Sequence, residues 1–350
     1  MSEHKAASAA EILRSYDGPH LRIMEVCGTH THEIFRLGIR KLLPPQVDLI
    51  SGPGCPVCVT PVGFIDEAIW LAEKGVTITT FGDLVRVPGT KTSLAGARAA
   101  GARVQVVYSP LDALEYAKQH TDEQVAFLSV GFETTVPAAC LAADAALAQG
   151  VDNFSLLVAN KTMPHAYAAL RDSADVFLYP GHVHAITGTQ LCEDLAEQGV
   201  SGVLAGFTAK ELVTALAVAV RKASEGKPFF VNAYTRVVKP EGQPAAVALI
   251  DKVMEPCDSE WRGLGVIEQS GLRLREPYAG VDARIKHDMP HIEGKANPAC
   301  RCGEVLRGAC KPSDCPVFGK GCTPQHPVGA CMVSGEGACS AYYQYGGGLV

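Results

Sequence analysis

Several features that mark other protein classes are missing from this chain of 350 residues. No apolar run approaches the roughly 18 residues of a membrane-spanning helix, so we expect none. The 31 basic and 37 acidic side chains give a net charge of −6 without a basic block, which argues against nucleic-acid binding. No Gly-x-x-x-x-Gly-Lys-Ser/Thr loop is present, so any ATP use would need another kind of site. Residues 1–16 carry several charges and do not resemble a secretory signal.

Cysteine, by contrast, is abundant and unevenly placed. Seven of the 13 cysteines fall within residues 300–350, and Cys27, Cys55 and Cys58 lie in two glycine-containing segments near the N-terminus. An odd number of cysteines without an export signal predicts the reducing cytoplasm, where metal-binding or catalytic thiols explain them better than structural disulfides. Thiolates at this density suit zinc, copper(I) or an iron–sulfur cluster.

Short β-branched runs alternate with helical patterns, which predicts an α/β fold with parallel sheets. We expect strands at residues 22–26, 47–51, 76–80, 103–108, 125–130, 154–159, 176–179 and 203–206. We interpret the chain as a first α/β domain at residues 40–148 and a second at residues 149–238. A third, loop-rich domain combines residues 1–39 and 239–350, where glycine, proline and cysteine increase and ligation replaces a large core. One sheet of eight strands is the alternative.

Distinctive segments follow four of the predicted strands. These segments are Cys27-Gly-Thr-His30, Gly52-Pro-Gly-Cys-Pro-Val-Cys58, Gly131-Phe-Glu-Thr-Thr135 and Pro180-Gly-His-Val-His184. Functional groups of parallel α/β units gather at the carboxyl ends of the strands. We therefore expect the four segments to line a single cleft.

The pair Cys55 and Cys58 can close a disulfide or bind a metal, and its spacing does not decide between them. A zinc ribbon normally needs a second pair at similar spacing, and no other C-x-x-C occurs. A helix is expected to begin near residues 61–63, so its amide groups would favour the thiolate. The plain alternative is a pair of small buried residues in a glycine turn.

Cys27 and His30 place a thiol and an imidazole close together, as a metal site or an activated nucleophile requires. His32 has no role beyond that of a polar helix residue. Glu133 could position a partner, a nucleotide or a proton, and Thr134 or Thr135 could simply cap the following helix. Either His182 or His184 is expected to face the cleft.

The C-terminal cysteines have irregular spacing, with no tight pair of the kind that zinc fingers use. Loops that wrap a compact anionic cluster explain this pattern better than a tetrahedral zinc site does. Unligated thiols at this density would be exposed to oxidation. The remaining Cys140, Cys192 and Cys257 are interpreted as ordinary core or surface residues.

The segments Cys27–His30, Gly52–Cys58 and Gly131–Thr135, together with the C-terminal cysteine spacing, resemble the HypD family of hydrogenase maturation factors. The resemblance extends to Gly335-Glu-Gly-Ala-Cys-Ser-Ala-Tyr-Tyr343 and so covers nearly the whole chain. It implies two α/β domains plus an iron–sulfur domain, with a 4Fe-4S cluster held by Cys302, Cys315, Cys322 and Cys339, and with Cys331 as a substitute ligand.

The resemblance also implies a role in building the Fe(CN)2CO unit of NiFe hydrogenases. In that role the protein pairs stably with HypC, receives cyanide from HypE, and serves the hydrogenase large subunit indirectly. Cys27 would bind the iron that carries cyanide and CO, and Cys55 and Cys58 would form a redox dithiol supplied by the cluster. The implied catalytic set is Cys27, His30, Cys55, Cys58 and Glu133, on an assembly scaffold rather than an enzyme that turns over a free substrate.

Two other classes of function stay open on the residues alone. A cluster-dependent thiol–disulfide reductase would use Cys55 and Cys58 on a protein substrate, but it would need no third thiol beside an imidazole. A zinc-binding or structural interaction platform would show no visible absorption that bleaches on reduction.

Overall fold

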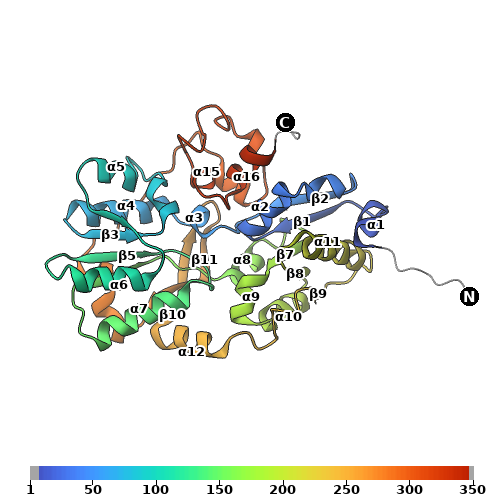
Figure 1. The fold of residues 1–350 in the computed structure, drawn as a ribbon. Helices are drawn as coiled ribbons and strands as arrows, with labels where there is room; N and C mark the ends of the chain where they lie inside the picture. Colours follow the sequence, from blue (N-terminus) through green and yellow to red (C-terminus); the bar gives the residue numbers. More distant parts are fainter. Residues whose placement is uncertain (1–7, 347–350) are drawn as a thin grey trace, which may run out of the picture.

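The computed structural model describes residues 8–346 (Figure 1). Its strands form two parallel sheets and one antiparallel hairpin, which confirms the expected α/β class. Residues 1–7 and 347–350 of the predicted third domain lie outside the described part. Across residues 8–346, none of the helices combines the length and the apolar character that crossing a membrane requires.

The first parallel sheet has the order β4-β3-β5-β6. Its strands are β3 (Thr77–Thr80), β4 (Val104–Val106), β5 (Val125–Ser129) and β6 (Phe154–Val158). Alternate residues of β5 face opposite cores: Ala126 and Leu128 pack with α4 (Val62–Glu73) and α5 (Leu94–Ala99), and Val125 and Phe127 pack with α6 (Pro110–Gln119) and α7 (Val136–Ala148). All five residues of β5 are buried, as expected for a parallel strand covered on both faces.

The second parallel sheet has the order β2-β1-β7-β8-β9. Its strands are β1 (Leu21–Glu25), β2 (Val47–Ser51), β7 (Val176–Pro180), β8 (Gly202–Ala205) and β9 (Phe230–Asn232). One face packs on α11 (Ala209–Ala223) and α1 (Ala9–Arg14), and the other on α8 (Met163–Ala169) and α10 (Gln190–Glu197). A capping box between Thr208 and Glu211 starts α11.

The strands are shared between the sheets differently from the predicted division of the chain. β1, expected in the third domain, pairs on one side with β2 of the first domain and on the other with β7 of the second, so that Ile23 lies opposite Val176. β6, expected in the second domain, pairs with β5 of the first, placing Val125 opposite Phe154. Parallel pairing can join strands that are far apart in the chain, and the hydrophobic pattern of a strand does not indicate which strands it pairs with.

The part of the chain after β9 contains a helix and a hairpin before it reaches the loop-rich region that the sequence predicts. The helix α12 (Pro244–Val253) leads into a hairpin of β10 (Met254–Trp261) and β11 (Gly265–Leu274), with a register shift between Cys257 and Ser259. The C-terminal segment, which we define as residues 297–346, has only short helices. They are α14 (Cys302–Leu306), η4 (Pro312–Asp314), α15 (Ala330–Val333) and α16 (Ala338–Tyr345).

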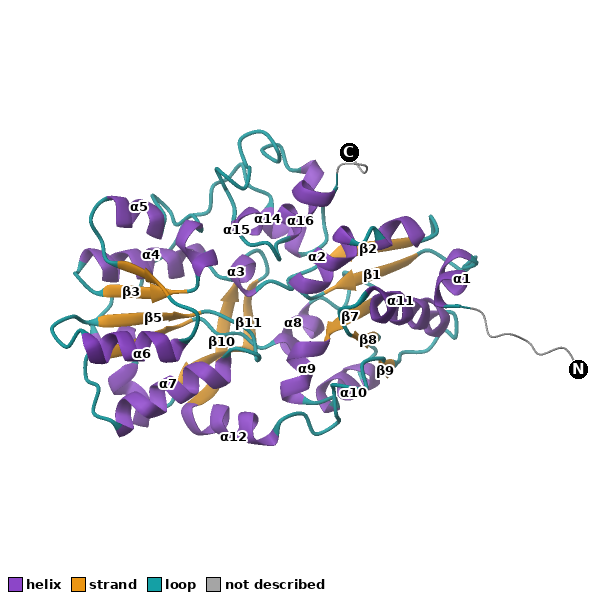
Figure 2. Ribbon diagram, in the orientation of Figure 1, coloured by secondary structure: helices purple, strands orange, loops and turns teal. Residues whose placement is uncertain are grey.

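The remaining elements are short connections. They are α2 (Gly28–Arg36), η1 (Ile39–Leu42), α3 (Pro56–Val59), η2 (Gly82–Arg86), α9 (Gly181–Thr187), η3 (Glu276–Val281) and α13 (Ala283–Lys286). Figure 2 shows β3 and β5 pointing toward the middle of the molecule from one side and β1 from the other. The C-terminal segment lies above this meeting point (Figure 1). The carboxyl ends of both sheets therefore face the same central region.

Candidate functional site

Cys27 and the C-x-x-C segment lie side by side, as predicted. Cys27 directly precedes α2, and the amide N–H of Gly28 donates to the carbonyl oxygen of Gly54 at 2.9 Å. A Cβ atom on Gly54 would clash with the backbone of Cys27, so only glycine allows this approach. The two loops follow β1 and β2, which are adjacent strands, and this is why residues far apart in the chain meet here.

Cys55 and Cys58 lie on either side of the first turn of α3, a short helix that precedes the one expected near residues 61–63. Both side chains are buried, and the amide N–H of Cys58 donates to the Cys55 sulfur at 3.3 Å. Burial raises the pKa of Cys58 well above its usual range, and a hydrogen bond with Cys331 opposes that rise. The pair thus has a sulfur neighbour from the C-terminal segment.

The Cys27 thiol is buried as well, and this burial raises its pKa to about 12. Hydrogen bonds from the backbone of His30 and Thr29 oppose the rise, because they favour the thiolate at the start of α2. A cation bound to the sulfur would act in the same direction, since a metal ligates the deprotonated form. Cys27 is therefore a shielded thiol that a metal ion can activate.

His30 is completely buried beside this thiol. Its Nε2 lies 3.0 Å from the carbonyl oxygen of Gly206 and must donate to it, which leaves Nδ1 as a bare acceptor without a protein partner. Burial lowers the pKa of His30 to about 4, so the imidazole is neutral at pH 7. Its ring also packs on that of Phe207, with the two ring centroids 4.8 Å apart. A neutral imidazole with one free nitrogen is suited to bind a metal or accept a proton.

Glu336, which sequence reasoning did not select, reaches the same place from the C-terminal segment. Its Oε1 accepts a hydrogen bond from the Thr29 hydroxyl at 2.7 Å, and its negative charge adds to the raised pKa of Cys27. A Cβ on Gly28 would collide with Glu336. The glutamate belongs to the Gly335–Tyr343 stretch of the family resemblance, and that was the available signal.

The two histidines after β7 separate in the structure, and the expected glycine turn is the helix α9. The ring of His182 stacks on that of Phe207, which His30 also contacts, with the two ring centroids 3.9 Å apart, and burial lowers the pKa of His182. His184 is turned away, with Nδ1 3.1 Å from the carbonyl oxygen of Gly188 and Nε2 3.4 Å from the sulfur of Cys192. Of the two, His182 is the one near the thiol site.

Glu133 follows β5 and so approaches from the other sheet. Its Oε1 accepts from the amide of Met163 at 2.8 Å, while Oε2 is buried without a partner. Burial raises the pKa of Glu133 to about 7. Tyr167 is near both regions, since charges on Glu133 and on Cys27 each contribute to the rise in its pKa. Glu133 therefore lies close to the interior that contains Cys27.

The capping role considered above for the threonines is not seen at Thr135. Thr135 precedes α7 without a side-chain capping bond, and its hydroxyl donates to the carbonyl oxygen of Phe132 at 3.1 Å.

His32 contacts the C-terminal segment through the carbonyl oxygen of Gly335 at 3.1 Å and the ring of Tyr345, whose centroid is 5.2 Å from that of the imidazole. His32 thus fastens α2 to that segment.

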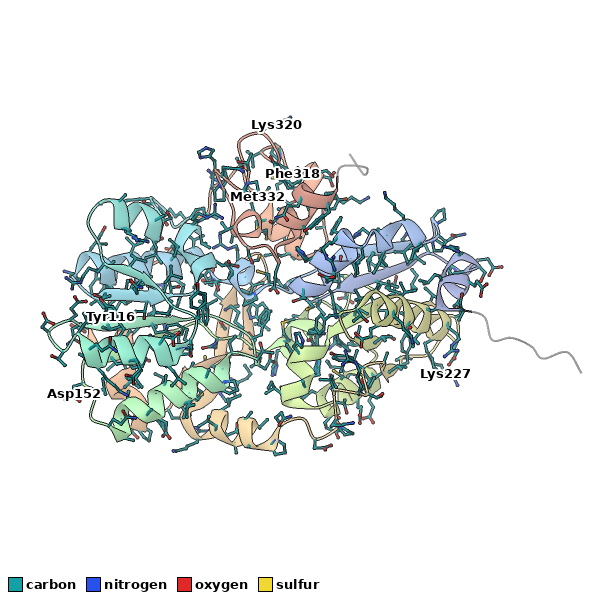
Figure 3. All side chains as sticks on the ribbon, in the orientation of Figure 1. Tyr116, Asp152, Lys227, Phe318, Lys320 and Met332 are labelled. Carbon is teal, nitrogen blue, oxygen red and sulfur yellow. The ribbon has the colours of Figure 1, made fainter. Side chains whose placement is uncertain are left out.

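Six cysteines of the C-terminal segment line one small cavity, which we call the sulfur cavity. They are Cys300, Cys302, Cys315, Cys322, Cys331 and Cys339. Phe318 and Met332 complete its wall (Figure 3), and Cys310 instead lines a separate pocket with Arg22 and Arg40. All four predicted cluster ligands, and the substitute Cys331, are therefore together.

Two contacts connect the sulfur cavity to the C-x-x-C pair. The sulfur of Cys302 lies 2.7 Å from that of Cys331, and Cys331 hydrogen-bonds to Cys58. The second contact forms because α15 packs on α3. Sulfur atoms thus follow one another from Cys55 through Cys58 and Cys331 to Cys302.

The donors of the sulfur cavity suit a polynuclear cluster better than a single ion. Among residues 8–346, no three histidine, cysteine or acidic side chains converge on one metal position. An iron–sulfur cubane takes each thiolate at a different iron, so its ligands surround a space instead of meeting at a point. Six soft donors around one cavity, five of them buried, fit that requirement in number and softness.

Comparison with known proteins gives consistent similarities over nearly the whole chain. The family model described as "HypD: Hydrogenase formation hypA family" matches residues 4–346. The hydrogenase maturation factor HypD of Rhodobacter capsulatus is 45% identical over 338 residues, covering 93% of this chain and 90% of that protein. HypD of Escherichia coli K12 is 42% identical over 350 residues, covering 98% and 94%. A putative hydrogenase expression/formation protein of Methanocaldococcus jannaschii is 40% identical over 329 residues, covering 93% and 92%.

Proposed function

This chain belongs to the HypD family of hydrogenase maturation factors, and on that premise we propose that it is the scaffold on which the Fe(CN)2CO unit is assembled. HypC is its stable partner and HypE the transient donor of cyanide, and the finished unit goes to the hydrogenase large subunit. The iron with its cyanide and CO ligands is cargo. The number of thiols, all unpaired, supports a cytoplasmic location.

The observation that carries this proposal is the contact between the Cys27 loop and the Cys55–Cys58 loop. The Gly28–Gly54 hydrogen bond holds a single buried thiol next to a dithiol. A reductase needs only the dithiol, whereas an assembly site needs an anchor for iron beside a source of electrons. Cys27 is the anchor in this proposal, with the bare Nδ1 of His30 and the carboxylate of Glu336 close by.

The dithiol matches the electron requirement of cyanide release. Splitting a thiocyanate into a thiol and cyanide consumes two electrons and one proton. Oxidation of Cys55 and Cys58 to a disulfide releases two electrons and two protons, so the sum yields thiol, cyanide, disulfide and one proton. Glu133, with a pKa of about 7 in the same interior, can take up that proton at neutral pH.

The sulfur cavity would hold the 4Fe-4S cluster, which supplies electrons one at a time when bound. The predicted ligands are Cys302, Cys315, Cys322 and Cys339. The close contact of Cys302 with Cys331, and of Cys331 with Cys58, supports a modified set. In it Cys302 and Cys331 form a second thiol pair between the dithiol and the cluster, and Cys300 takes the fourth ligand position.

Infrared spectroscopy of the protein purified with HypC tests the anchor role directly. We expect cyanide and CO stretching bands in the native complex and none in the Cys27→Ala complex, with equal cluster iron and sulfide in both. Cys257→Ala is the matched control, because Cys257 lies on the hairpin away from the site. Bands that persist in Cys27→Ala at native intensity would contradict the proposal.

The path of sulfur contacts also favours a second candidate, a cluster-dependent thiol–disulfide reductase acting on a protein substrate. The two candidates differ at Cys27, which a reductase does not need. A Cys27→Ala variant that still supports hydrogenase maturation would favour the reductase.

A further inference from the structure

A second cavity is larger than the sulfur cavity and shares two lining cysteines with it. It has a volume of about 670 Å³ and is lined by Arg262, Lys295, Cys300 and Cys302, among others. We call it the Arg262 cavity. Volumes of roughly 300–1,000 Å³ are typical of small-molecule sites. Because Cys300 and Cys302 line both cavities, a ligand here would lie directly in front of the thiols.

The charge of the Arg262 cavity has one sign. Arg262 and Lys295 are its cationic residues, and none of the described residues that line it is aspartate or glutamate. The whole chain, in contrast, carries a net charge of −6. The nearby carboxylate of Asp66 accepts hydrogen bonds from the backbone N–H of Thr90 at 2.8 Å and from the hydroxyl of the same residue. The lining therefore favours an anionic ligand.

Arg262 is held in place with part of its guanidinium unused. Its backbone N–H donates to Val59 at 2.8 Å, and its Nε donates to the carbonyl oxygen of Thr60 at 2.9 Å. Its Nη2 is buried and has no hydrogen-bond partner among the described residues, so this nitrogen is closed to the cavity. The charge of the guanidinium still acts on the cavity that Arg262 lines, and it attracts the oxygens of a carboxylate or phosphate.

The rest of the wall can hold the body of such a molecule. Val62, Pro88, Pro298, Pro327 and Val328 supply apolar surface around the two cations. Inorganic phosphate would fill only a small part of the cavity and would leave this surface in contact with water. The combination of one cationic side and several apolar walls points to an organic ion.

We propose that the Arg262 cavity binds a small organic oxyanion, with its carboxylate or phosphate on Arg262 and its apolar part against the proline and valine side chains. This site is separate from Cys27, which is not among the residues that line the cavity. Its occupant would control access of solvent and reagents to Cys300 and Cys302 from this side. The site goes beyond the proposed assembly function and does not depend on it.

Isothermal titration calorimetry on the full chain, purified without oxygen and containing its cluster, tests the site. The probes are benzoate, phenyl phosphate and inorganic phosphate. We expect saturable 1:1 binding of benzoate or phenyl phosphate, and whichever binds identifies the carboxylate or the phosphate as the preferred group. Arg262→Gln should weaken binding at least tenfold, because it removes a charged hydrogen-bond donor.

Two further variants make the result specific. Lys295→Gln changes an exposed side chain and should weaken binding several-fold without affecting the fold. Arg307→Gln is the control, because Arg307 is exposed and donates to the Gly263 carbonyl oxygen instead of lining the cavity. The proposal is overturned if neither organic probe binds, if inorganic phosphate binds as tightly as they do, or if the Arg262 and Lys295 variants bind like Arg307→Gln.

Discussion

The two parallel sheets and the C-terminal segment are stabilised in different ways. The sheets bury whole strands: every residue of β5, β6 and β7 is inaccessible, with helices on both faces. The C-terminal segment has helices of three to eight residues, lengths at which an isolated helix is marginal in water. Its buried side chains include five of the six cysteines of the sulfur cavity.

The two parts therefore differ in the interaction that supplies their free energy of folding. The sheets depend on removal of apolar surface from water, which needs no cofactor. The C-terminal segment gathers thiols that are costly to bury as thiolates, and ligation of the proposed cluster would offset this cost. The thiols of the proposed assembly site lie at the boundary: Cys27, Cys55 and Cys58 are held by the sheets but contact the C-terminal segment.

The largest expected effect comes from removing a thiol that both candidate ligand sets contain. Cys315→Ala should lose all cluster iron and sulfide and most of the soluble protein, because ligation and folding of the segment are coupled. Iron and sulfide analysis, with the yield of soluble protein, measures this. Cys310→Ala is the matched control, since Cys310 lies in the same segment but outside the sulfur cavity. Native iron content in Cys315→Ala would show that the segment folds without ligation at that position.

A second pair of variants decides which thiol is the fourth ligand. If Cys300 ligates the cluster, Cys300→Ser should lose its iron while Cys302→Ser keeps it, and the set predicted from the sequence requires the reverse. Serine preserves the size of the side chain, so the difference reports on ligation and not on packing. Anaerobic iron analysis and the visible spectrum of both variants measure it. Equal iron loss in both would reject a separate role for the Cys302–Cys331 pair.

Much of the sheet region could be predicted from local patterns. The expected strands at residues 47–51, 125–130 and 154–159 are β2, β5 and β6 with small changes at their ends. Which sheet each strand joins could not be predicted, because the pairing of β1 with β7 depends on contacts between distant segments. The hairpin was missed because only the end residues of β10, Met254 and Trp261, are buried, and the polar residues between them show no period-2 hydrophobic pattern.

The thiol site was predictable for a different reason. Cys27 and Cys55 each follow a strand, and parallel strands bring their carboxyl ends to one edge. Glu336 and the Cys302–Cys331 contact arise from the docking of the C-terminal segment onto α2 and α3, and the irregular loops of that segment carry no periodicity from which docking can be inferred.

A third prediction separates function from stability at the boundary. Cys55→Ser should lower hydrogenase maturation at least a hundredfold while cluster iron, HypC binding and the thermal midpoint stay near native values. The reason is that a single remaining thiol cannot release two electrons as a disulfide. Hydrogenase activity in a strain carrying only the variant measures this, with Cys257→Ser as the control outside the site. Native activity in Cys55→Ser would make the pair structural.

The smallest effect concerns the sheet region, where a buried carboxyl makes stability depend on pH. The pKa of Glu133 is about 7 in the folded protein against an ordinary value of 4.5. Below the lower value the carboxyl is protonated in both states and costs nothing. As pH rises from 4.5 to 7 the unfolded chain releases its proton first, so the free energy of unfolding falls, by at most about 3 kcal/mol.

Glu133→Gln should remove this dependence, because the amide stays neutral and its oxygen can still accept from the Met163 N–H. Urea denaturation at pH 5 and pH 8 should therefore show a larger loss of stability in the native protein than in the variant. Glu115→Gln, at an exposed residue of α6, should behave like the native protein. If the native and Glu133→Gln proteins lose the same stability between these pH values, the pKa of Glu133 is not raised in the folded state, and its carboxylate could not hold the released proton at neutral pH.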